Sequence, residues 1–351
     1  MATGPSRDDA ALAEGLGRWI VAHQDLVPGA ATGGPPLRLE SLSHDRGGMA
    51  NETVLVDLGS GHAGMVVRLP PVVPTFAHYD LAPQALVQNA VAQEGVPAPA
   101  PALVVTETEW IGTPFLVMPR VSGSIPGPAP LFDPWITGAG PQAQRKVHDG
   151  LIDTLVAVHA VDWRASGLGH VLPGPTLDKA LVSWTEYVQW AGGGDPLPEL
   201  VGALEWCRRH QPAEGDGSGP PVLLWGDPRL GNLVFDEARN VHAVLDWDLA
   251  AIGPREMDLG WHFGLELMME ELFGRRVPGF PDRGAALARY AAHSGHVVAH
   301  LVWHEVFALV RALAINDRHQ RIAGNPGRRD NPMRGILRGR VEAAGNGAAQ
   351  G

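Results

Sequence analysis

Three polar residues, Asp227, Asn232 and Asp246, have the types and spacing that phosphate chemistry needs. In VLLWGDPRLGNLVF, residues 222–235, the first two lie five positions apart on a Gly- and Pro-containing stretch between apolar runs. The run AVLDWD follows, so a hairpin would bring Asp246 back beside Asn232. An amide oxygen and a carboxylate are hard ligands, which suit Mg²⁺ on nucleotide phosphates better than Zn²⁺. Asp227 would then orient or deprotonate a hydroxyl nucleophile, and phosphoryl transfer needs few other groups.

A simpler interpretation is that all three are turn residues, because Asp, Asn and Gly form turns through local hydrogen bonds. For any one residue this interpretation is as good as the functional one. The three residues together, at this spacing, favour a functional site.

The composition limits the class of protein. The 351 residues include 27 basic and 38 acidic side chains, for a formal net charge of −11. This balance argues against a nucleic-acid or membrane-surface partner, because both select basic patches. The single cysteine, Cys207, excludes an internal disulfide and indicates a reducing compartment. With no apolar run of signal-peptide or membrane-spanning type, we expect a cytoplasmic protein; its oligomeric state is unknown at this point.

The apolar periodicity predicts an α+β chain with two main parts. Residues 1–35 read as an amphipathic helix followed by a Gly/Pro-rich link. Residues 36–121 contain alternating runs such as ETVLVDL and GMVVRL, which predict an antiparallel sheet with one helix. Residues 122–343 are mostly helical, with helices expected at 176–193, 197–210, 256–273 and 285–320. Residues 344–351 are predicted to be a disordered tail.

The stretches WGDPRLGNLVF and AVLDWDLAAIGPREMDLGW resemble the signature of the aminoglycoside phosphotransferase-like kinases, the type that includes choline kinase. The likeness covers about residues 36–320 and is strongest to the branch associated with acyl-CoA dehydrogenases. It implies a bilobal protein-kinase-like fold, with a small β-rich N-lobe that binds nucleotide and a larger, mostly helical C-lobe. It also implies Mg²⁺, ATP with GTP as an alternative, and a small-molecule hydroxyl acceptor.

Carried over residue by residue, the resemblance makes Asp227 the catalytic aspartate and makes Asn232 and Asp246 the magnesium ligands. Asp258, in EMDLGW, matches an acidic residue that braces the catalytic loop. His159 matches a position that packs behind that loop, and a structural role suits it better than proton transfer.

In the N-lobe, the resemblance assigns nucleotide-binding positions. RGGMANET resembles the loop over the phosphates, with Gly48 and Asn51 in it, and the backbone from Pro119 to Val121 would meet the adenine. Arg68 occupies the position of the phosphate-holding lysine, with a different reach and geometry. Gln84 replaces the glutamate that pairs with this cation, so the resemblance implies a weaker or differently arranged nucleotide clamp.

Two further positions concern the C-lobe. Trp225 stands where most members have His, and we expect repacking of a scaffold position rather than lost chemistry. Arg311 and His304 share one face of a late helix that borders the acceptor pocket in relatives. Arg311 could bind an anionic substrate group, although a structural salt bridge is the better interpretation. Glu266, together with Glu270 and Glu271, could attract a polycation, although such runs are more often solvated helix faces.

Four functional hypotheses follow. A metabolite kinase is preferred, with a hydroxylated acyl compound favoured over an aminoglycoside as the acceptor. A nucleotide-binding pseudokinase is the second, because of Arg68 and Gln84. An aminoglycoside or other antibiotic kinase and a metal-dependent phosphohydrolase that uses the same carboxylates complete the set.

Overall fold

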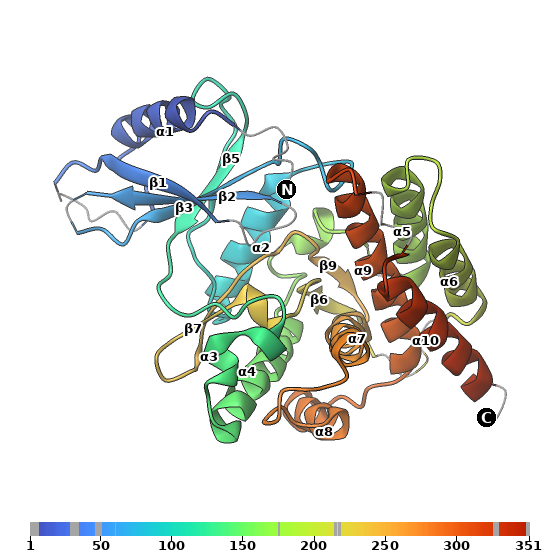
Figure 1. The fold of residues 1–351 in the computed structure, drawn as a ribbon. Helices are drawn as coiled ribbons and strands as arrows, with labels where there is room; N and C mark the ends of the chain where they lie inside the picture. The colour runs from blue at the N-terminus through green and yellow to red at the C-terminus, as the bar shows by residue number, and fades with distance from the viewer. Residues whose placement is uncertain are drawn as a thin grey trace. The chain divides into compact units, whose positions relative to one another are not determined.

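The computed structural model describes residues 7–28, 35–45, 51–59, 61–174, 176–213, 216, 219–325 and 330–348. The chain divides into two compact units, Met1–Ser122 and Gly123–Gly351 (Figure 1). Each unit is described below by itself. Gly48, which the sequence places over the nucleotide phosphates, lies outside the described residues.

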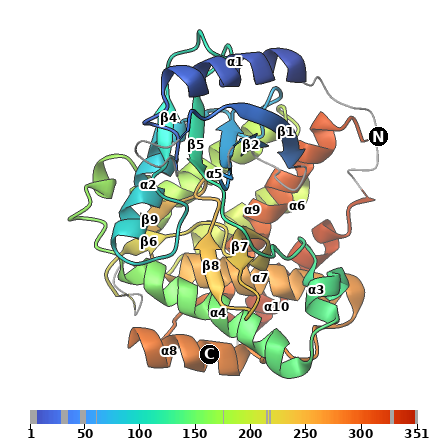
Figure 2. The ribbon, with the colours of Figure 1, turned by 90° about the vertical axis from the view of Figure 1, so that its left-hand side faces the viewer.

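The first unit is built on a five-stranded antiparallel sheet with the strand order β1-β2-β3-β5-β4 (Figure 2). Val67 of the central strand is paired with Val54 on one side and Val117 on the other. The strands are β1 (Leu39–Asp45), β2 (Glu52–Leu58), β3 (Met65–Leu69), β4 (Leu103–Val105) and β5 (Phe115–Pro119).

A helix covers each face of this sheet, because alternate side chains of a strand point to opposite faces. Helix α1 (Asp9–Ala22) packs through Leu16 and Trp19 in a core with Val67 and other residues of that face. Helix α2 (Leu81–Gln93) packs on the other face, in a cluster with Leu116, Met118 and Val66. Arg68, two positions after Val66, therefore shares the α2 face of the sheet.

Helix α1 forms because its apolar residues repeat every three to four positions and because its first turn is capped. Asp8 accepts hydrogen bonds from the backbone N–H groups of Ala10 and Ala11, which have no partner within the helix. The capped helix can then bury Leu12, Leu16, Trp19 and Ile20 as one face.

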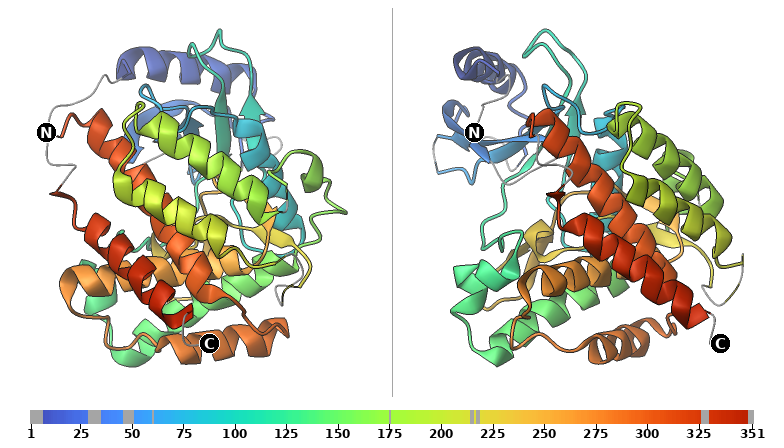
Figure 3. Two further views of the ribbon diagram at one scale, coloured as in Figure 1. Left: turned by 90° about the vertical axis from the view of Figure 1, so that its right-hand side faces the viewer. Right: turned by 45° about the vertical axis from the view of Figure 1, so that its right-hand side comes forward.

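The second unit is mostly helical and is organised around α9 (Leu301–Ile322), which is buried along most of its length. Helices α6 and α10 lie along α9 (Figure 3), and α7 crosses it closely. The other helical elements are η1 (Pro130–Phe132), α3 (Pro134–Thr137), α4 (Pro141–Ala160), η2 (Leu168–His170), α5 (Leu177–Ala191), α6 (Pro198–Arg209), η3 (Leu230–Asn232), α7 (Glu256–Phe273), α8 (Arg283–Ser294) and α10 (Met333–Ala348).

Two small antiparallel ladders lie in this unit, and the segments that join them carry the motif residues. Strand β6 (Val222–Leu224) pairs with β9 (Ala251–Gly253), and β7 (Leu233–Phe235) pairs with β8 (Val241–Val244). Both loops that join one ladder to the other, residues 225–232 and 245–250, therefore begin and end on fixed strands.

The structure corrects two expectations for the C-terminal helices. The single helical run expected at 285–320 is divided into α8 and α9 after Gly295, which takes a left-handed φ of 70° at the end of α8. The tail expected to be disordered from residue 344 is helical as far as Ala348. Leu337 and Ala344, seven positions apart on α10, are both buried in the core around α9. This packing stabilises the helix beyond residue 344. None of the described helices is long and apolar enough to cross a membrane.

We predict that Leu16→Ala destabilises the first unit by about 2–5 kcal/mol, because it leaves a cavity under α1. Leu16 is 0% exposed, whereas Val21 on the same helix is 61% exposed. Val21→Ala is therefore the matched control and should leave the free energy of unfolding nearly unchanged. Urea unfolding of both variants measures the difference, and equal losses would show that α1 is not anchored through Leu16.

Candidate active site

The loop between β6 and β7 is fixed by its close approach to the loop after β8. Gly226 has a φ of 93°, and a Cβ at this position would lie 2.1 Å from the carbonyl oxygen of Leu249. Leu245 N donates to Asn232 O at 2.9 Å, and the Trp225 indole Nε1 donates to Leu245 O at 2.8 Å. The hairpin thus brings Asp246 to the same end of the ladder as Asn232.

Asp227 is held by three N–H donors. Its Oδ1 accepts from the Trp261 indole at 2.7 Å, and its Oδ2 accepts from Arg229 Nε and from Asn232 Nδ2, both at 2.8 Å. These bonds occupy three of the roughly four lone-pair directions of a carboxylate. Asp227 is therefore a fixed anion with one direction left for a further donor.

Arg229 lies between the two acidic loops of the site. Burial would by itself lower the pKa of its guanidinium, but Asp227, followed by Asp246, raises that pKa overall. Arg229 therefore remains a cation and partly neutralises the two carboxylates.

Asn232 is fixed by hydrogen bonds to Asp227, and Asp246 has an unusual backbone conformation. Asn232 is buried, and its Nδ2 donates to both the backbone O (3.0 Å) and Oδ2 of Asp227, which turns Oδ1 away from Asp227. Asp246 adopts a left-handed φ of 62°. Asp tolerates this conformation better than most residues, and such outliers are enriched at functional sites.

Asp258, on the first turn of α7, holds the backbone of the loop. Its Oδ2 accepts from Trp225 N at 2.7 Å, and its Oδ1 accepts from Gly226 N at 2.9 Å. His159, at the end of α4, lies behind it, with Nε2 at 3.1 Å from Asp258 Oδ2 and Nδ1 at 2.7 Å from the Tyr290 hydroxyl. Burial raises the pKa of Tyr290 to about 12, so its hydroxyl keeps its proton beside His159 Nδ1.

Arg311 supports the same loop and also lines a cavity of the second unit, together with Trp184, Gly226 and Asp258. It is 4% exposed, its guanidinium lies 4.9 Å from the Trp184 ring and 4.6 Å from the Trp261 ring, and Nη2 donates to Gly226 O at 3.1 Å. Burial lowers the pKa of Arg311 to about 10, while Asp258 and Asp227 oppose this shift. Among the described residues it has no ion-pair partner, so the expected structural salt bridge is replaced by two cation–π contacts.

The two other residues expected at an acceptor pocket lie in different surroundings. His304 is 1% exposed and packs against Gly260 where α7 and α9 cross, so it is not accessible to a small molecule. Glu266 lines a cavity together with loop residues 228–231 and Leu265, Met269 and Phe280. This cavity, of about 770 Å³ with the part open to solvent, lies wholly within the second unit.

The predicted nucleotide residues of the first unit lie on its sheet and on α2. Arg68 and Gln84 are buried on the facing surfaces of β3 and α2, and the Gln84 Oε1 has no hydrogen-bond partner among the described residues. Asn51 is buried immediately before β2. Pro119, at the end of β5, and Val121 are partly exposed.

The sequence did not single out several residues of the second-unit site. Trp261 and Arg229 stand inside the quoted motifs, but nothing in their type shows that they bind Asp227. His262 precedes Glu266 by four positions on a predicted helix, which is a recognisable spacing. Its neighbour His148 comes from α4 and could be placed only by the fold.

We predict that Gly226→Ala costs more stability than Gly274→Ala. Both glycines have a left-handed φ, but a Cβ at Gly274 meets no atom within 4 Å. Gly274→Ala should cost about 1–2 kcal/mol for its conformation, and Gly226→Ala about 1–3 kcal/mol more for its overlap with Leu249. Urea unfolding measures both, and equal costs would mean that the two loops can separate freely.

We also predict that His304 makes the protein sensitive to acid. Burial lowers its folded-state pKa from 6.5 to about 3. The unfolded chain therefore binds the proton first, and stability falls by up to about 1.4 kcal/mol per pH unit as the pH drops below 6.5. Unfolding of His304→Gln from pH 7 to pH 4 should show a smaller slope than wild type, whereas His242→Gln, at an exposed position, should not. Identical slopes in all three proteins would contradict this assignment.

Comparison with known proteins identifies the relatives of the chain. A model of the phosphotransferase enzyme family matches residues 41–301. Acyl-CoA dehydrogenase family member 11 of Rattus norvegicus is 31% identical over 221 residues, which cover 62% of this chain and 27% of that protein. The chain thus spans little more than a quarter of the length of this relative.

Solved structures share the fold. A protein from Ralstonia eutropha, provisionally named an aminoglycoside phosphotransferase, is 23% identical, with a TM-score of 0.70 over 94% of this chain and 98% of its own. The GDP complex of aminoglycoside 2'-phosphotransferase-IIIa is 16% identical, with a TM-score of 0.53 over 94% and 99%. The α+β, protein-kinase-like fold class predicted from the sequence is confirmed. On the family match over most of its length, the chain belongs to the phosphotransferase enzyme family.

Proposed function

We propose that the protein is a small-molecule kinase that transfers the γ-phosphoryl group of ATP, or alternatively of GTP, to a hydroxyl group. The observation that carries this proposal is the arrangement of Asp227, Asn232 and Asp246 on two loops that are hydrogen-bonded to each other. Phosphoryl transfer depends mainly on positioning and electrostatic stabilisation, and a rigid pair of loops supplies the positioning.

Asn232 and Asp246 would hold Mg²⁺. The donor set is an amide oxygen turned away from Asp227 and a carboxylate on a left-handed residue, and such oxygen ligands fit this ion. When bound, Mg²⁺ neutralises charge on the phosphate oxygens.

Asp227 would position the acceptor. Three donors already fix its carboxylate, so the remaining lone-pair direction can accept a hydrogen bond from the attacking hydroxyl. Trp261 and Arg229 hold the aspartate in place on either side, and Asp258 holds the backbone that carries it.

The first unit would bind the nucleotide. Arg68, Asn51 and Gly48 are proposed to contact the phosphates, and the backbone from Pro119 to Val121 the base. A protein with the same fold, aminoglycoside 2'-phosphotransferase-IIIa, has been solved as a GDP complex, which supports the proposal that this chain binds a nucleotide. Gln84 cannot form an ion pair with Arg68, so we expect a weaker hold on the phosphates than a lysine–glutamate pair gives.

The cavity beside residues 228–231 would take the acceptor. Its walls include the apolar side chains Leu265, Met269 and Phe280, and its charged residues are the cations Arg229, Arg275 and Arg276 and the carboxylates Glu266 and Glu270. With an apolar wall and three cations against two carboxylates, the cavity fits an apolar hydroxylated compound better than a polycationic aminoglycoside. A relative named acyl-CoA dehydrogenase family member 11 agrees with an acyl-type acceptor.

A pseudokinase is the second candidate. It is favoured by Gln84, which is buried with an unpartnered Oε1 where a kinase needs an anion beside the phosphate-holding cation. Magnesium-dependent nucleotide binding without turnover on a broad panel of hydroxylated acyl compounds would support it.

The first experiment compares nucleotide binding with and without Mg²⁺ for wild type, Asp246→Asn and Asp236→Asn. Asn tolerates the left-handed backbone of residue 246, so Asp246→Asn removes charge with little change of conformation. Asp236 lies at the opposite end of the same hairpin, where it binds Asn240. We expect Asp246→Asn to weaken the Mg²⁺-dependent binding of ATP or GTP at least about 10-fold, and Asp236→Asn to bind as wild type does.

If wild type binds neither nucleotide at millimolar concentration, the kinase proposal is wrong. If both variants bind as wild type does, Asp246 is not a magnesium ligand.

A further inference from the structure

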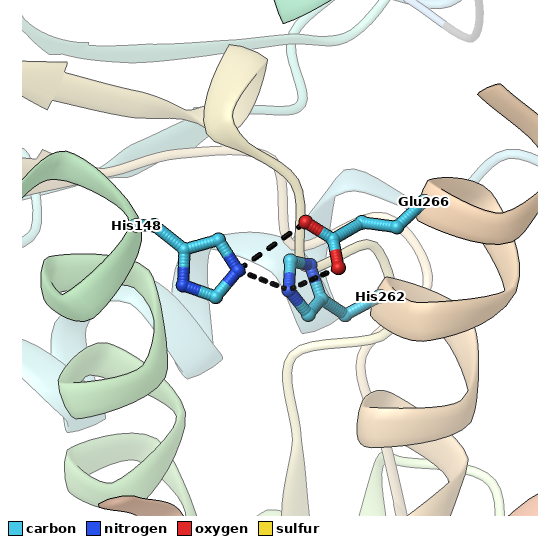
Figure 4. A group of neighbouring side chains, drawn as sticks. All are labelled: His148, His262 and Glu266. Carbon is cyan, nitrogen blue, oxygen red and sulfur yellow. Dashed lines mark hydrogen bonds and ion pairs between the residues drawn. The ribbon is translucent and has the colours of Figure 1, made fainter. Parts of the chain in front are cut away.

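A second cluster of ligand-type side chains lies beside the cavity. His148 of α4 points toward His262 and Glu266, which are one turn apart on α7 (Figure 4). One nitrogen or oxygen atom of each of the three lies within 4.8 Å of the others. None of the three has a role in the proposed phosphoryl transfer.

Two of the three distances in this cluster are close to the edge of a zinc tetrahedron, and the third is longer. His148 Nε2 lies 3.3 Å from His262 Nε2 and 3.2 Å from Glu266 Oε1, and His262 Nε2 lies 3.9 Å from Glu266 Oε2. Zinc bonds of about 2.0–2.1 Å place two tetrahedral ligands about 3.3–3.4 Å apart. The two imidazole nitrogens and the Glu266 carboxylate therefore lie close enough to converge on one ion, after a small rotation of the carboxylate that brings one oxygen near both nitrogens.

We propose that His148, His262 and Glu266 form a site for Zn²⁺ or a similar transition-metal ion, with one coordination position open toward the cavity. Two histidines and a glutamate are a ligand set of catalytic zinc sites, which keep a fourth position for water or substrate. Such a site is separate from the oxygen ligands Asn232 and Asp246, because imidazole nitrogen selects zinc-like ions over Mg²⁺.

The surroundings of the cluster suit a metal ion. His148 is 0% exposed, and the Phe280 ring lies 5.1 Å from its ring, so water cannot replace the ligand on that side. The Glu266 side chain is 28% exposed and lines the cavity together with His262, which gives an entry path and an open side.

The protonation state of His262 agrees with this assignment. Burial, in the first place, lowers the pKa of His262 to about 4, so its imidazole is neutral at pH 7 and offers a lone pair. Without a metal ion, the Nε2 atoms of His148 and His262 would share a single proton in a hydrogen bond. This hydrogen-bonded arrangement is the alternative to test.

Because His262 and Glu266 lie in the cavity wall, the ion would help to recognise the compound bound in the cavity. The catalytic-loop residues 228–231 line the same cavity, so an ion here would coordinate an anionic or hydroxyl group of the bound compound. Zinc binding does not depend on the proposed kinase activity, and it can be tested without nucleotide.

The experiment measures Zn²⁺ binding by calorimetry and by metal content after dialysis, using metal-free full-length protein. Wild type should bind one equivalent, and His262→Gln and Glu266→Gln should each weaken that binding at least about 100-fold. His293→Gln is the matched control, because His293 pairs with Asp153 on another surface and is exposed. It should retain the equivalent. Co²⁺ bound to wild type should show the intense visible absorption of a tetrahedral site.

Thermal unfolding separates loss of the site from loss of the fold. Zn²⁺ should raise the unfolding temperature of wild type and of His293→Gln but not of folded His262→Gln or Glu266→Gln. If His262→Gln does not fold, the Glu266→Gln protein decides the result. Absence of Zn²⁺ binding by wild type, or equal binding by Glu266→Gln and wild type, would overturn the proposal and leave a hydrogen-bonded triad.

Discussion

The structure of the second unit depends on one buried carboxylate, Asp258, which accepts hydrogen bonds from the consecutive N–H groups of Trp225 and Gly226. Consecutive amides can point to one acceptor only if the chain turns sharply between them, and Gly226 permits that turn with a φ of 93°. The turn presses the chain against Leu249 and brings the loops that carry Asp227 and Asp246 together. A change at Asp258 would therefore alter both loops.

Helix α7 connects this support to the rest of the site. Trp261 and His262 follow Asp258 by three and four positions, and Glu266 follows His262 by four, so all four residues lie along one side of the helix. The first braces the loop backbone, the second donates to Asp227, and the last two face the cavity and His148. The proposed metal site and the proposed acceptor position are therefore held by one rigid element, which would fix the distance between them.

The sequence predicted the parts of the fold that local patterns determine. The predicted helix at 256–273 has the observed limits of α7, and the hairpin between Asn232 and Asp246 follows from two apolar runs and a turn. The surroundings of Arg311 and His148 could not be predicted, because their neighbours come from helices far away in the sequence. Arg311 lies near Trp184 and Trp261, and His148 meets a residue 114 positions later. The helical end at 344–348 was missed for the same reason, since Ala344 is ordered by a core built around α9.

Trp225 differs from the family motif in residue type, but it still connects the two loops of the site. The family pattern has a histidine at this position, and a ring nitrogen there could donate or accept a hydrogen bond. The Trp225 indole can only donate, and it donates to Leu245 O, immediately before Asp246. Its ring packs beside Trp247, with centroids 6.1 Å apart, and fills the space between the two loops. The larger, mostly apolar tryptophan therefore still connects the two loops through its hydrogen bond and its packing. On this view the chemistry depends on the distance between the loops, and the residue at 225 is free to vary as long as one N–H reaches Leu245.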